Sequence, residues 1–394
     1  MSGTTIPPTA TFREKYIFLV AAEESGDRLG AALMHALQER TDGVVRFSGV
    51  GGREMSRHGL VSLFSIEELA ILGISAIPRR LPMILRRLRE TTNAIIATRP
   101  DALVIIDSPD FTHRVARRVR TADRSIPILN YVSPTVWAWR PGRARAMRRY
   151  IDHVLALFPF EPGVHQRLGG PPCTYVGHPL ADKIGNLRPN AEEARRRLAD
   201  PPIVMVLPGS RGSEIQRLLT IFADAIFRVQ SVVGPLDIVL PTVPHLRDQV
   251  MATISAWPQS PRVVVDQAEK EAAFRVARAA LAKSGTVTLE LALAGVPTVA
   301  AYRVSAVEAV VGRLMIHAPS AILPNLVIGE NVVPEFLQGN CTAERLAATL
   351  IPLLSDGPER RRQLEAFARL DAIMEIGRRT PAVSAADIVL AMLH

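Results

Sequence analysis

Cysteine is almost missing from this chain of 394 residues: only Cys173 and Cys341 are present, far apart and outside any C-x-x-C pattern. This scarcity excludes a disulfide framework, and no clustering of Cys and His suggests a zinc site. Apolar runs are broken by Pro, Gly or charge well before the ~18 residues that a membrane-spanning helix needs. We therefore expect a protein of the reducing cytoplasm that is soluble or at most peripheral to a membrane.

Aromatic residues are also scarce, at 5%, whereas arginine is abundant and the formal net charge is +9. Six Arg against one Glu lie in 79–99, and five Arg lie in 140–149. Such stripes attract polyanions, namely nucleic acid, anionic lipid or a phosphorylated substrate, although each Arg can also lie on a solvated helix face. Nucleic acid is disfavoured because no recognised binding motif accompanies the charge.

Strand-like and helix-like segments alternate along the chain, a rhythm that predicts parallel sheets covered by helices on both faces. The length predicts two domains. A tail over 1–14 precedes a first domain over 15–182, which 366–394 complete, and a second domain covers 183–365. The expected strands are 16–20, 44–47, 102–106, 128–132, 153–158, 203–207, 237–240, 262–265, 277–281 and 298–304; the expected helices are 27–37, 81–97 and several after 342.

Two stretches of the second half share one layout, in which a strand runs into a small-residue turn and a helix. In PGSRGSE, Ser213 and Gln216 predict a capping box, and Arg211 lies in the turn. Backbone N–H groups and the positive end of a helix suit phosphate, and a guanidinium can clamp a diphosphate. An ordinary strand-to-helix turn with an exposed Arg is the alternative.

The second such turn, SGTVTLE, strengthens the phosphate interpretation. Ser284 and Thr286 are natural caps, and Gly285 permits a ligand to approach closely. Glu290 lies one helical turn below Thr286, where it can accept two hydroxyls of a ribose. Glu290 can also be an ordinary surface carboxylate. Two phosphate-type turns in one domain favour a nucleoside diphosphate as ligand.

Acidic residues mark the strand ends of the first half. The loop AEESGD carries Glu23 and Asp27, which repel phosphate and suit the hydroxyls of a sugar, although a helix cap is the alternative for Asp27. In IDSPDF, Asp107 ends a buried strand, where open α/β sheets bind ligands, and is a candidate general base. It can also accept backbone N–H groups, and Asp110 is expected to cap a helix.

The tryptophans Trp137 and Trp139 follow the next strand of the first half, beside Arg140. Paired aromatic side chains there can stack on a sugar or line an acyl pocket, or they can fill the end of the sheet. Lone histidines such as His113 and His178 are expected to be core residues, and no metal cluster appears at ligand spacing.

These motifs together resemble those of the lipid-A-disaccharide synthases, from about residue 16 to the end of the chain. The resemblance rests on the following colinear motifs: AEESGD, FSGVGG, EELAILGI, IDSPDF, YVSPTVWAWR, FPFE, VGHPLAD, LPGSRGSE, SGTVTLE and LPNLVIGENVVPEFLQ.

The resemblance implies a GT-B fold, two Rossmann-like parallel-sheet domains facing across a cleft. It implies an inverting transferase that joins UDP-2,3-diacylglucosamine to 2,3-diacylglucosamine 1-phosphate, giving a β-1,6 disaccharide and UDP without a metal or other cofactor. It also implies peripheral attachment to the cytoplasmic face of the bacterial inner membrane, and a homodimer.

The resemblance assigns roles to individual residues. It makes Asp107 the base on the acceptor hydroxyl and places Glu23 in the acceptor loop. It makes Arg211 the phosphate clamp and Glu290 the ribose ligand. The other residues expected at the donor are Ser210, Gly212, Ser284, Gly285, Thr286, Asn325, Glu335 and Gln338.

Three alternatives remain at this stage. The first two are other UDP-sugar enzymes of the same architecture, an N-acetylglucosaminyltransferase and a 2-epimerase, against which IDSPDF and WAWR argue. The third is a non-catalytic polyanion-binding protein. Because both sugars carry fatty chains, we also hypothesise that Ile71, Leu72, Ile74 and Ile77, next to Arg79 and Arg80, dip into an anionic membrane surface.

Overall fold

The structure, a computed structural model, describes residues 14–69, 77–255, 257, 259–305, 308–309 and 319–393, without the side chains of 77–80. The predicted tail lies outside the described residues apart from Glu14. The chain forms two compact units, the first made of Met1–Pro179 and Arg379–His394 and the second of Leu180–Arg378.

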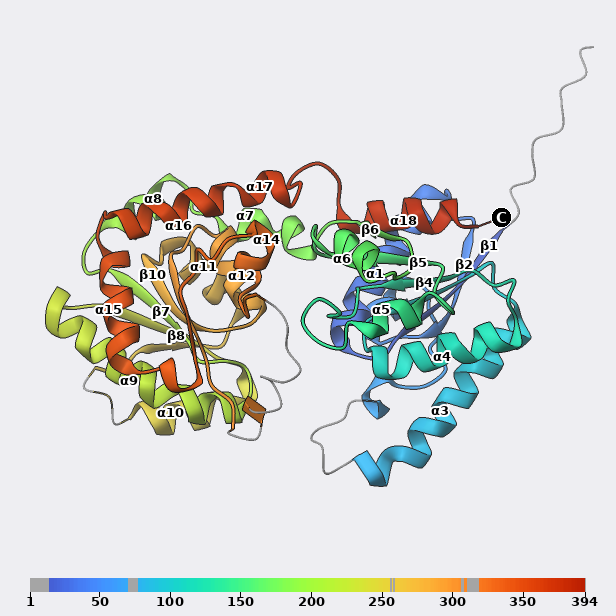
Figure 1. The fold of residues 1–394 in the computed structure, drawn as a ribbon, viewed down its shortest axis with the longest axis horizontal. Helices are drawn as coiled ribbons and strands as arrows, with labels where there is room; N and C mark the ends of the chain where they lie inside the picture. The colour runs from blue at the N-terminus through green and yellow to red at the C-terminus, as the bar shows by residue number, and fades with distance from the viewer. Residues whose placement is uncertain are drawn as a thin grey trace, which may run out of the picture. The chain divides into compact units, whose positions relative to one another are not determined.

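The first unit contains a six-stranded parallel sheet of order β2-β1-β3-β4-β5-β6 (Figure 1). Its strands are β1 (Lys15–Ala21), β2 (Val45–Val50), β3 (Ala102–Ile106), β4 (Ile128–Tyr131), β5 (His153–Ala156) and β6 (Cys173–Tyr175). Its helices are α1 (Glu24–Arg40), α2 (Arg53–Arg57), α3 (Ile77–Thr98), α4 (Pro109–Ala122), α5 (Gly142–Met147), α6 (Glu161–Arg167) and α18 (Pro381–Ala391), with short 3-10 turns at Ile66–Glu68 and Pro179–Lys183.

Helices cover both faces of this sheet, which explains why its strands are nearly continuous apolar runs. Side chains of α1, α2 and α18 pack on one face and those of α3 and α4 on the other. The C-terminal helix α18 packs against α1, so the last residues of the chain contribute to the core of the first unit (Figure 1).

The second unit contains another six-stranded parallel sheet, of order β12-β11-β10-β7-β8-β9. Its strands are β7 (Ile203–Leu207), β8 (Asp237–Pro241), β9 (Arg262–Val264), β10 (Ala279–Lys283), β11 (Thr298–Tyr302) and β12 (Glu335–Leu337). Its helices are α7 (Ile184–Leu187), α8 (Ala191–Leu198), α9 (Gly212–Val233), α10 (Arg247–Ile254), α11 (Gln267–Val276), α12 (Thr286–Leu293), α14 (Leu323–Ile328), α15 (Ala343–Leu354), α16 (Pro358–Ala368) and α17 (Leu370–Ile373). The short 3-10 turns are Pro244–Leu246 and Gln338–Asn340.

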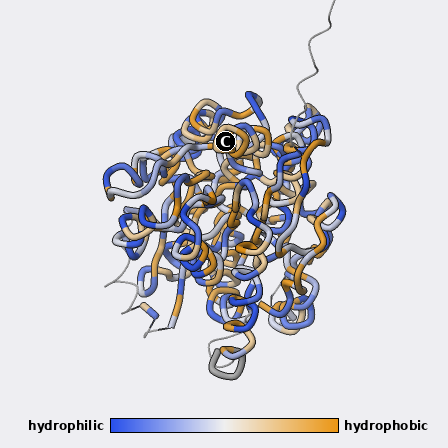
Figure 2. Tube along the Cα trace, turned by 90° about the vertical axis from the view of Figure 1, so that its right-hand side faces the viewer, coloured by the Kyte–Doolittle hydropathy of each residue, from blue (hydrophilic) through white to orange (hydrophobic). Residues whose placement is uncertain are grey.

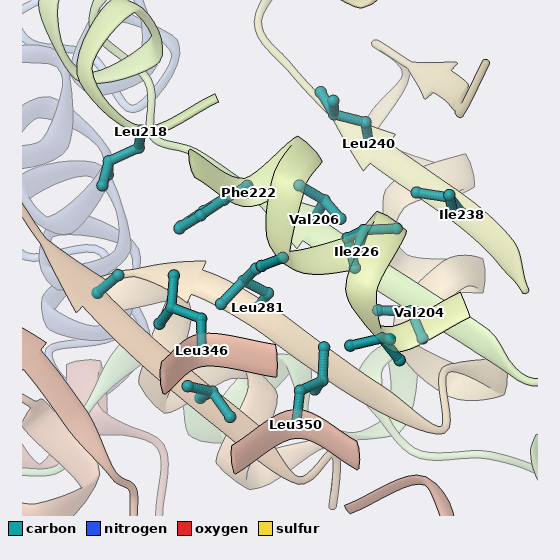
Figure 3. Close-up of a cluster of buried hydrophobic side chains, with 14 of the residues drawn as sticks. Val204, Val206, Leu218, Phe222, Ile226, Ile238, Leu240, Leu281, Leu346 and Leu350 are labelled. Carbon is teal, nitrogen blue, oxygen red and sulfur yellow. The ribbon is translucent and has the colours of Figure 1, made fainter. Parts of the chain in front are cut away.

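Leucine, isoleucine, valine and phenylalanine at helical spacing form the core of the second unit. Side chains of α9 and α15 interdigitate over β7, β8 and β10 (Figure 3). Burying one such side chain stabilises the fold by about 1.5–3 kcal/mol. In Figure 2 the outer loops are mostly hydrophilic, whereas hydrophobic stretches concentrate toward the interior.

The α/β fold with two parallel sheets is confirmed, and all ten predicted strands are present. Some predicted strands run too long: β4 ends at Tyr131 because Val132 has a left-handed backbone with φ of 76°. The predicted strand 277–281 lies two residues further on, as β10. The strands β6 and β12 were not predicted, because each is a three-residue strand at the edge of its sheet and too short to show a pattern.

Candidate functional site

The two phosphate-type turns follow β7 and β10, which are hydrogen-bonded neighbours in the middle of the second sheet. From β7 the chain continues to β8 and β9 on one side, and from β10 it continues to β11 and β12 on the other. The pair β7/β10 is therefore the topological switch point of the sheet, and open α/β sheets bind ligands outside the carboxyl ends of the strands at that point.

The first turn is organised by Glu214 rather than by the predicted pair Ser213 and Gln216. Helix α9 begins at Gly212, so Arg211 is the residue before the helix. The Glu214 carboxylate folds back and accepts hydrogen bonds from the backbone N–H groups of Ser210 (3.0 Å) and Arg211 (3.3 Å). The predicted capping box is thus wrong, because it was placed two residues too late.

A glycine is required before this turn. Gly209 has φ of 122°, and a Cβ built on it would lie 2.3 Å from an oxygen of Glu214. A side chain at this position would expel the carboxylate from the turn. Ser210 and the side chain of Arg211 are exposed.

The second turn begins α12 with Gly285 as the residue before the helix, not with Ser284 or Thr286 as capping residues. The Ser284 hydroxyl is buried and donates to the carbonyl of Ala321 (2.7 Å), so it holds the neighbouring loop. Thr286 is exposed in the first turn of α12. None of the described residues accepts a hydrogen bond from the N–H of Thr286, which leaves this donor for a ligand.

Both turns open into one cavity of about 530 Å³ in the second unit. Its lining includes Arg211, Gly285, Thr286 and Glu290, so the structure brings together predicted donor residues from both turns, whereas the predicted Gly212 and Ser284 do not line the cavity. The remaining lining residues are Leu207, Gly209, Ser210, Glu214, Pro241, Thr242, Val243, Pro244, Val264, Val265, Gln267, Lys270, Lys283 and Val287. Convergent polar groups above two helix N-termini give this cavity the chemistry that suits an anionic small molecule.

Both carboxylates of the cavity are paired with lysines that the sequence analysis did not identify. The Nζ of Lys270 lies 2.9 Å from an oxygen of Glu290, and the Nζ of Lys283 lies 3.1 Å from an oxygen of Glu214. All four side chains are less than a quarter exposed. Lys270 comes from α11 and Lys283 from the last position of β10, so only the fold reveals these pairs.

The other predicted donor residues come from the second half of this unit. The Asn325 side chain is buried, accepts the N–H groups of Val332 (3.0 Å) and Val333 (2.8 Å), and donates to the carbonyl of Val333 (2.9 Å). Glu335, the first residue of β12, accepts the N–H of Ala321 (3.0 Å). These two side chains position loops.

Gln338 follows β12 directly and has a left-handed backbone with φ of 51°. Since β12 is parallel to β11 and β11 to β10, Gln338 lies at the same sheet edge as the two phosphate-type turns. None of Asn325, Glu335 and Gln338 lines the cavity described above.

The acidic residues of the first unit lie at an equivalent point of its own sheet. The strands β1 and β3 are neighbours, with Ala21 beside Ile106, and the order of the sheet reverses between them. Glu23 follows β1 as the exposed residue before α1, and Asp107 follows β3. The structure therefore places both residues at one switch point.

Asp107 is linked directly to the acidic loop. The hydroxyl of Ser25 donates to one carboxylate oxygen of Asp107 (3.3 Å), and the N–H of Ser108 donates to the other (2.8 Å). Gly26 permits this approach, because a Cβ there would lie only 3.3 Å from the carbonyl oxygen of Ile106.

The backbone at Asp107 is strained. Asp107 and Ser108 have φ of 51° and 43°, a left-handed conformation that costs about 1–3 kcal/mol for each residue. The hydroxyl of Thr112 holds the turn by donating to the carbonyl of Asp107 (2.7 Å). The Ser108 hydroxyl oxygen is buried with no partner among the described residues. Strain and unsatisfied polar atoms of this kind concentrate at functional sites.

Two neighbouring aspartates have roles that differ from the predictions. Asp27 does cap a helix, but the helix is α2 rather than its own, because its carboxylate accepts the N–H groups of Gly52, Glu54 and Met55 at 2.7–3.1 Å. Asp110 is not a cap. Helix α4 begins at Pro109, so Asp110 is already inside its first turn, where it is exposed and lies 3.5 Å from Arg143.

The tryptophans are anchored differently. Trp137 donates through Nε1 to the buried Glu161 (3.3 Å), whereas Trp139 donates to Thr135 (2.8 Å) and lies under the guanidinium of Arg140. His113 and His178 are buried, and burial lowers the pKa of His113 to about 3 and that of His178 to about 4.

We predict that the stability of the first unit depends on pH through Glu161. Burial raises the pKa of this carboxyl to about 8, above its ordinary value near 4.5. The neutral form therefore stabilises the first unit fully below about pH 4.5, and this stabilisation is lost as the pH rises to about 8. Urea unfolding of Glu161→Gln should show a flatter pH dependence than that of the unchanged protein over this range. Equal slopes would contradict this interpretation.

Ile71, Leu72 and Ile74 of the hypothesised membrane segment lie outside the described residues, as do the side chains of Ile77, Arg79 and Arg80. Among the described residues, no helix combines the length and apolar character needed to cross a bilayer. The same residues contain no group of three or more His, Cys, Asp or Glu arranged to hold a metal ion.

Comparison with known proteins adds sequence relatives and a structural relative. A family model described as lipid-A-disaccharide synthetase matches residues 17–389. The chain is 62% identical to the lipid-A-disaccharide synthase of Nitrobacter hamburgensis over 386 residues, 98% of each chain. It is 63% identical to that of Rhodopseudomonas palustris strain HaA2 over 379 residues, 96% of each chain. The solved glycotransferase of kitacinnamycin has a TM-score of 0.62 at 17% identity, covering 97% of this chain and all of that one.

Proposed function

The chain belongs to the lipid-A-disaccharide synthase family, and we propose that the cavity of its second unit binds the UDP part of the donor while Asp107 of its first unit activates the acceptor. It is a UDP-dependent glycosyltransferase with the two-domain GT-B fold that forms the lipid A disaccharide. Its substrates are a UDP-sugar and a sugar phosphate. The single observation that carries the proposed site is that Arg211, Gly285, Thr286 and Glu290 line one cavity.

On the donor side, the N-termini of α9 and α12 receive the diphosphate. The Arg211 side chain is 80% exposed, and its guanidinium, 3.7 Å from Glu214, can turn from that weak ion pair onto a phosphate. The N–H of Thr286 offers the ligand an unused donor. Glu290 accepts the ribose hydroxyls, with Lys270 holding its carboxylate in place. Asn325 and Glu335 act indirectly by fixing neighbouring loops of the same unit.

On the acceptor side, Asp107 removes the proton of the attacking hydroxyl as that oxygen forms its bond to the anomeric carbon. The bond between the anomeric carbon and the phosphate oxygen breaks at the same time, and the electron pair leaves with UDP. A single displacement of this kind inverts the anomeric centre and needs no covalent intermediate. Positive groups fixed at the diphosphate stabilise the charge that develops there.

The alternative functions considered from the sequence are disfavoured. Relatives at 62–63% identity over nearly the whole chain carry the synthase name, which favours neither another UDP-sugar enzyme nor a non-catalytic polyanion-binding protein. The structural likeness at 17% identity shows the fold alone.

The experiment that tests the proposed function is product analysis. We expect the purified protein, incubated with UDP-2,3-diacylglucosamine and 2,3-diacylglucosamine 1-phosphate, to release UDP and a β-1,6-linked disaccharide 1-phosphate in equal amounts. Release of UDP without a disaccharide, or an α linkage, would contradict the proposed chemistry.

We further propose that the protein works on the cytoplasmic face of an anionic membrane, because both substrates carry acyl chains and arginines are concentrated in 79–99 and 140–149. Binding to vesicles containing phosphatidylglycerol should weaken strongly from 50 to 500 mM salt, and neutral vesicles should bind poorly. Equal binding to neutral and anionic vesicles would refute the electrostatic part.

A further inference from the structure

Lys283 lies between the two turns that form the donor cavity. It is the last residue of β10, and its Nζ lies 3.1 Å from a carboxylate oxygen of Glu214, which organises the first turn. A Cβ built on Gly285 of the second turn would lie 3.7 Å from the same Nζ. The ammonium group therefore pairs with the first turn, lies close to the second and lines the cavity that they share.

The ammonium group is held in place but not saturated. The Lys283 side chain is only 18% exposed, and its Nζ lies 5.3 Å from the centre of the Tyr302 ring, at a distance typical of a cation–π contact. An ammonium group has three donors, and its ion-pair partner here is the Glu214 carboxylate. Removing a cation from water to this extent costs free energy unless the cation is paired with an anionic group. The remaining donors are available to a ligand in the cavity.

Glu214 already carries the groups that offset its own charge. Its carboxylate accepts two backbone N–H groups and lies at the positive end of α9. The Glu214 carboxylate therefore orients Lys283 without fully neutralising the positive charge of the lysine. The charged groups that line the cavity are Arg211, Lys270, Lys283, Glu214 and Glu290, a net charge of +1 from three cations and two anions.

Building on the proposed function, we infer that Lys283 binds the diphosphate of the donor and that Glu214 is the residue that positions it. Arg211 reaches the diphosphate from the exposed side of the cavity, whereas Lys283 contacts it from the buried side. The lysine then also stabilises the negative charge on UDP as it leaves.

The test is calorimetric titration of the full-length protein with UDP and, separately, with uridine. For Lys283→Met we expect the affinity for UDP to fall at least about tenfold, with the affinity for uridine unchanged within about twofold. Lys270→Met is the matched control, because that lysine lines the same cavity but pairs with Glu290. It should change the affinities for UDP and uridine by similar factors.

Three results would overturn the inference: unchanged UDP affinity in Lys283→Met, an equal loss for uridine, or the same UDP-selective loss in Lys270→Met. Lys283→Arg guards against a misfolded variant, since it keeps the charge and should retain more UDP affinity than Lys283→Met. As a readout for positioning, Glu214→Gln should weaken UDP binding, and the double variant with Lys283→Met should be no weaker than Lys283→Met alone. If the unchanged protein does not bind UDP, the proposed function fails instead.

Discussion

Replacing Asp107 by Asn is expected to lower kcat by about 10²–10⁴-fold, the usual contribution of a general base. The amide oxygen can still accept the N–H of Ser108, and the amide NH2 can donate to the hydroxyl oxygen of Ser25, so the strained turn should survive. The UDP cavity belongs to the second unit, and UDP affinity should therefore stay within about twofold of the original. Steady-state turnover and UDP titration measure the two quantities.

Asp110→Asn is the matched control for this prediction. Asp110 lies three residues away on the same turn, but its carboxylate is 88% exposed and pairs only distantly with Arg143. Its replacement should leave turnover nearly unchanged. If Asp107→Asn retained more than a tenth of the original kcat, Asp107 would be a structural carboxylate that accepts backbone and hydroxyl hydrogen bonds.

Replacing Arg197 by Met is expected to destabilise the second unit by about 3–5 kcal/mol. The guanidinium of Arg197 is buried and donates to four carbonyls at 2.9–3.2 Å, those of Phe274, Arg275, Ala294 and Gly295. These carbonyls end α11 and α12, so one side chain satisfies the C-termini of two helices. Methionine has a similar length but would leave all four acceptors unsatisfied.

Urea unfolding of the full-length protein measures this loss. Arg195→Met is the control, because Arg195 lies on the same helix, is exposed, and bonds only to the carbonyl of Ala191 in its own helix. Its replacement should change the free energy of unfolding by no more than about 0.5 kcal/mol. Equal effects of the two substitutions would show that the buried hydrogen bonds of Arg197 contribute little.

The sequence predicts this fold well where local pattern and tertiary structure agree. Apolar runs with helices between them locate ten strands, because strands buried on both faces must be apolar throughout. The turns after β7 and β10 are visible because Gly209 and Gly285 have a local function, a left-handed backbone in the first case and close access to the helix N-terminus in the second.

What the sequence could not predict depends on contacts between distant segments. In the sequence, Glu214 is indistinguishable from any other glutamate of a helix. Only the fold brings Lys283, from β10, next to it. Asp27 lies in the first turn of its own helix α1 but caps α2, by accepting N–H groups that lie 25 to 28 residues further along the chain. In both cases the side chain could satisfy several partners, and only the sheet order determines which partner is near.

A crystal structure of the full chain with UDP would locate the nucleotide directly. We expect the diphosphate over the N-termini of α9 and α12, within hydrogen-bond distance of Lys283 or Arg211, and the ribose hydroxyls on Glu290. UDP bound anywhere else, or a diphosphate out of reach of both helix ends, would contradict the proposed site.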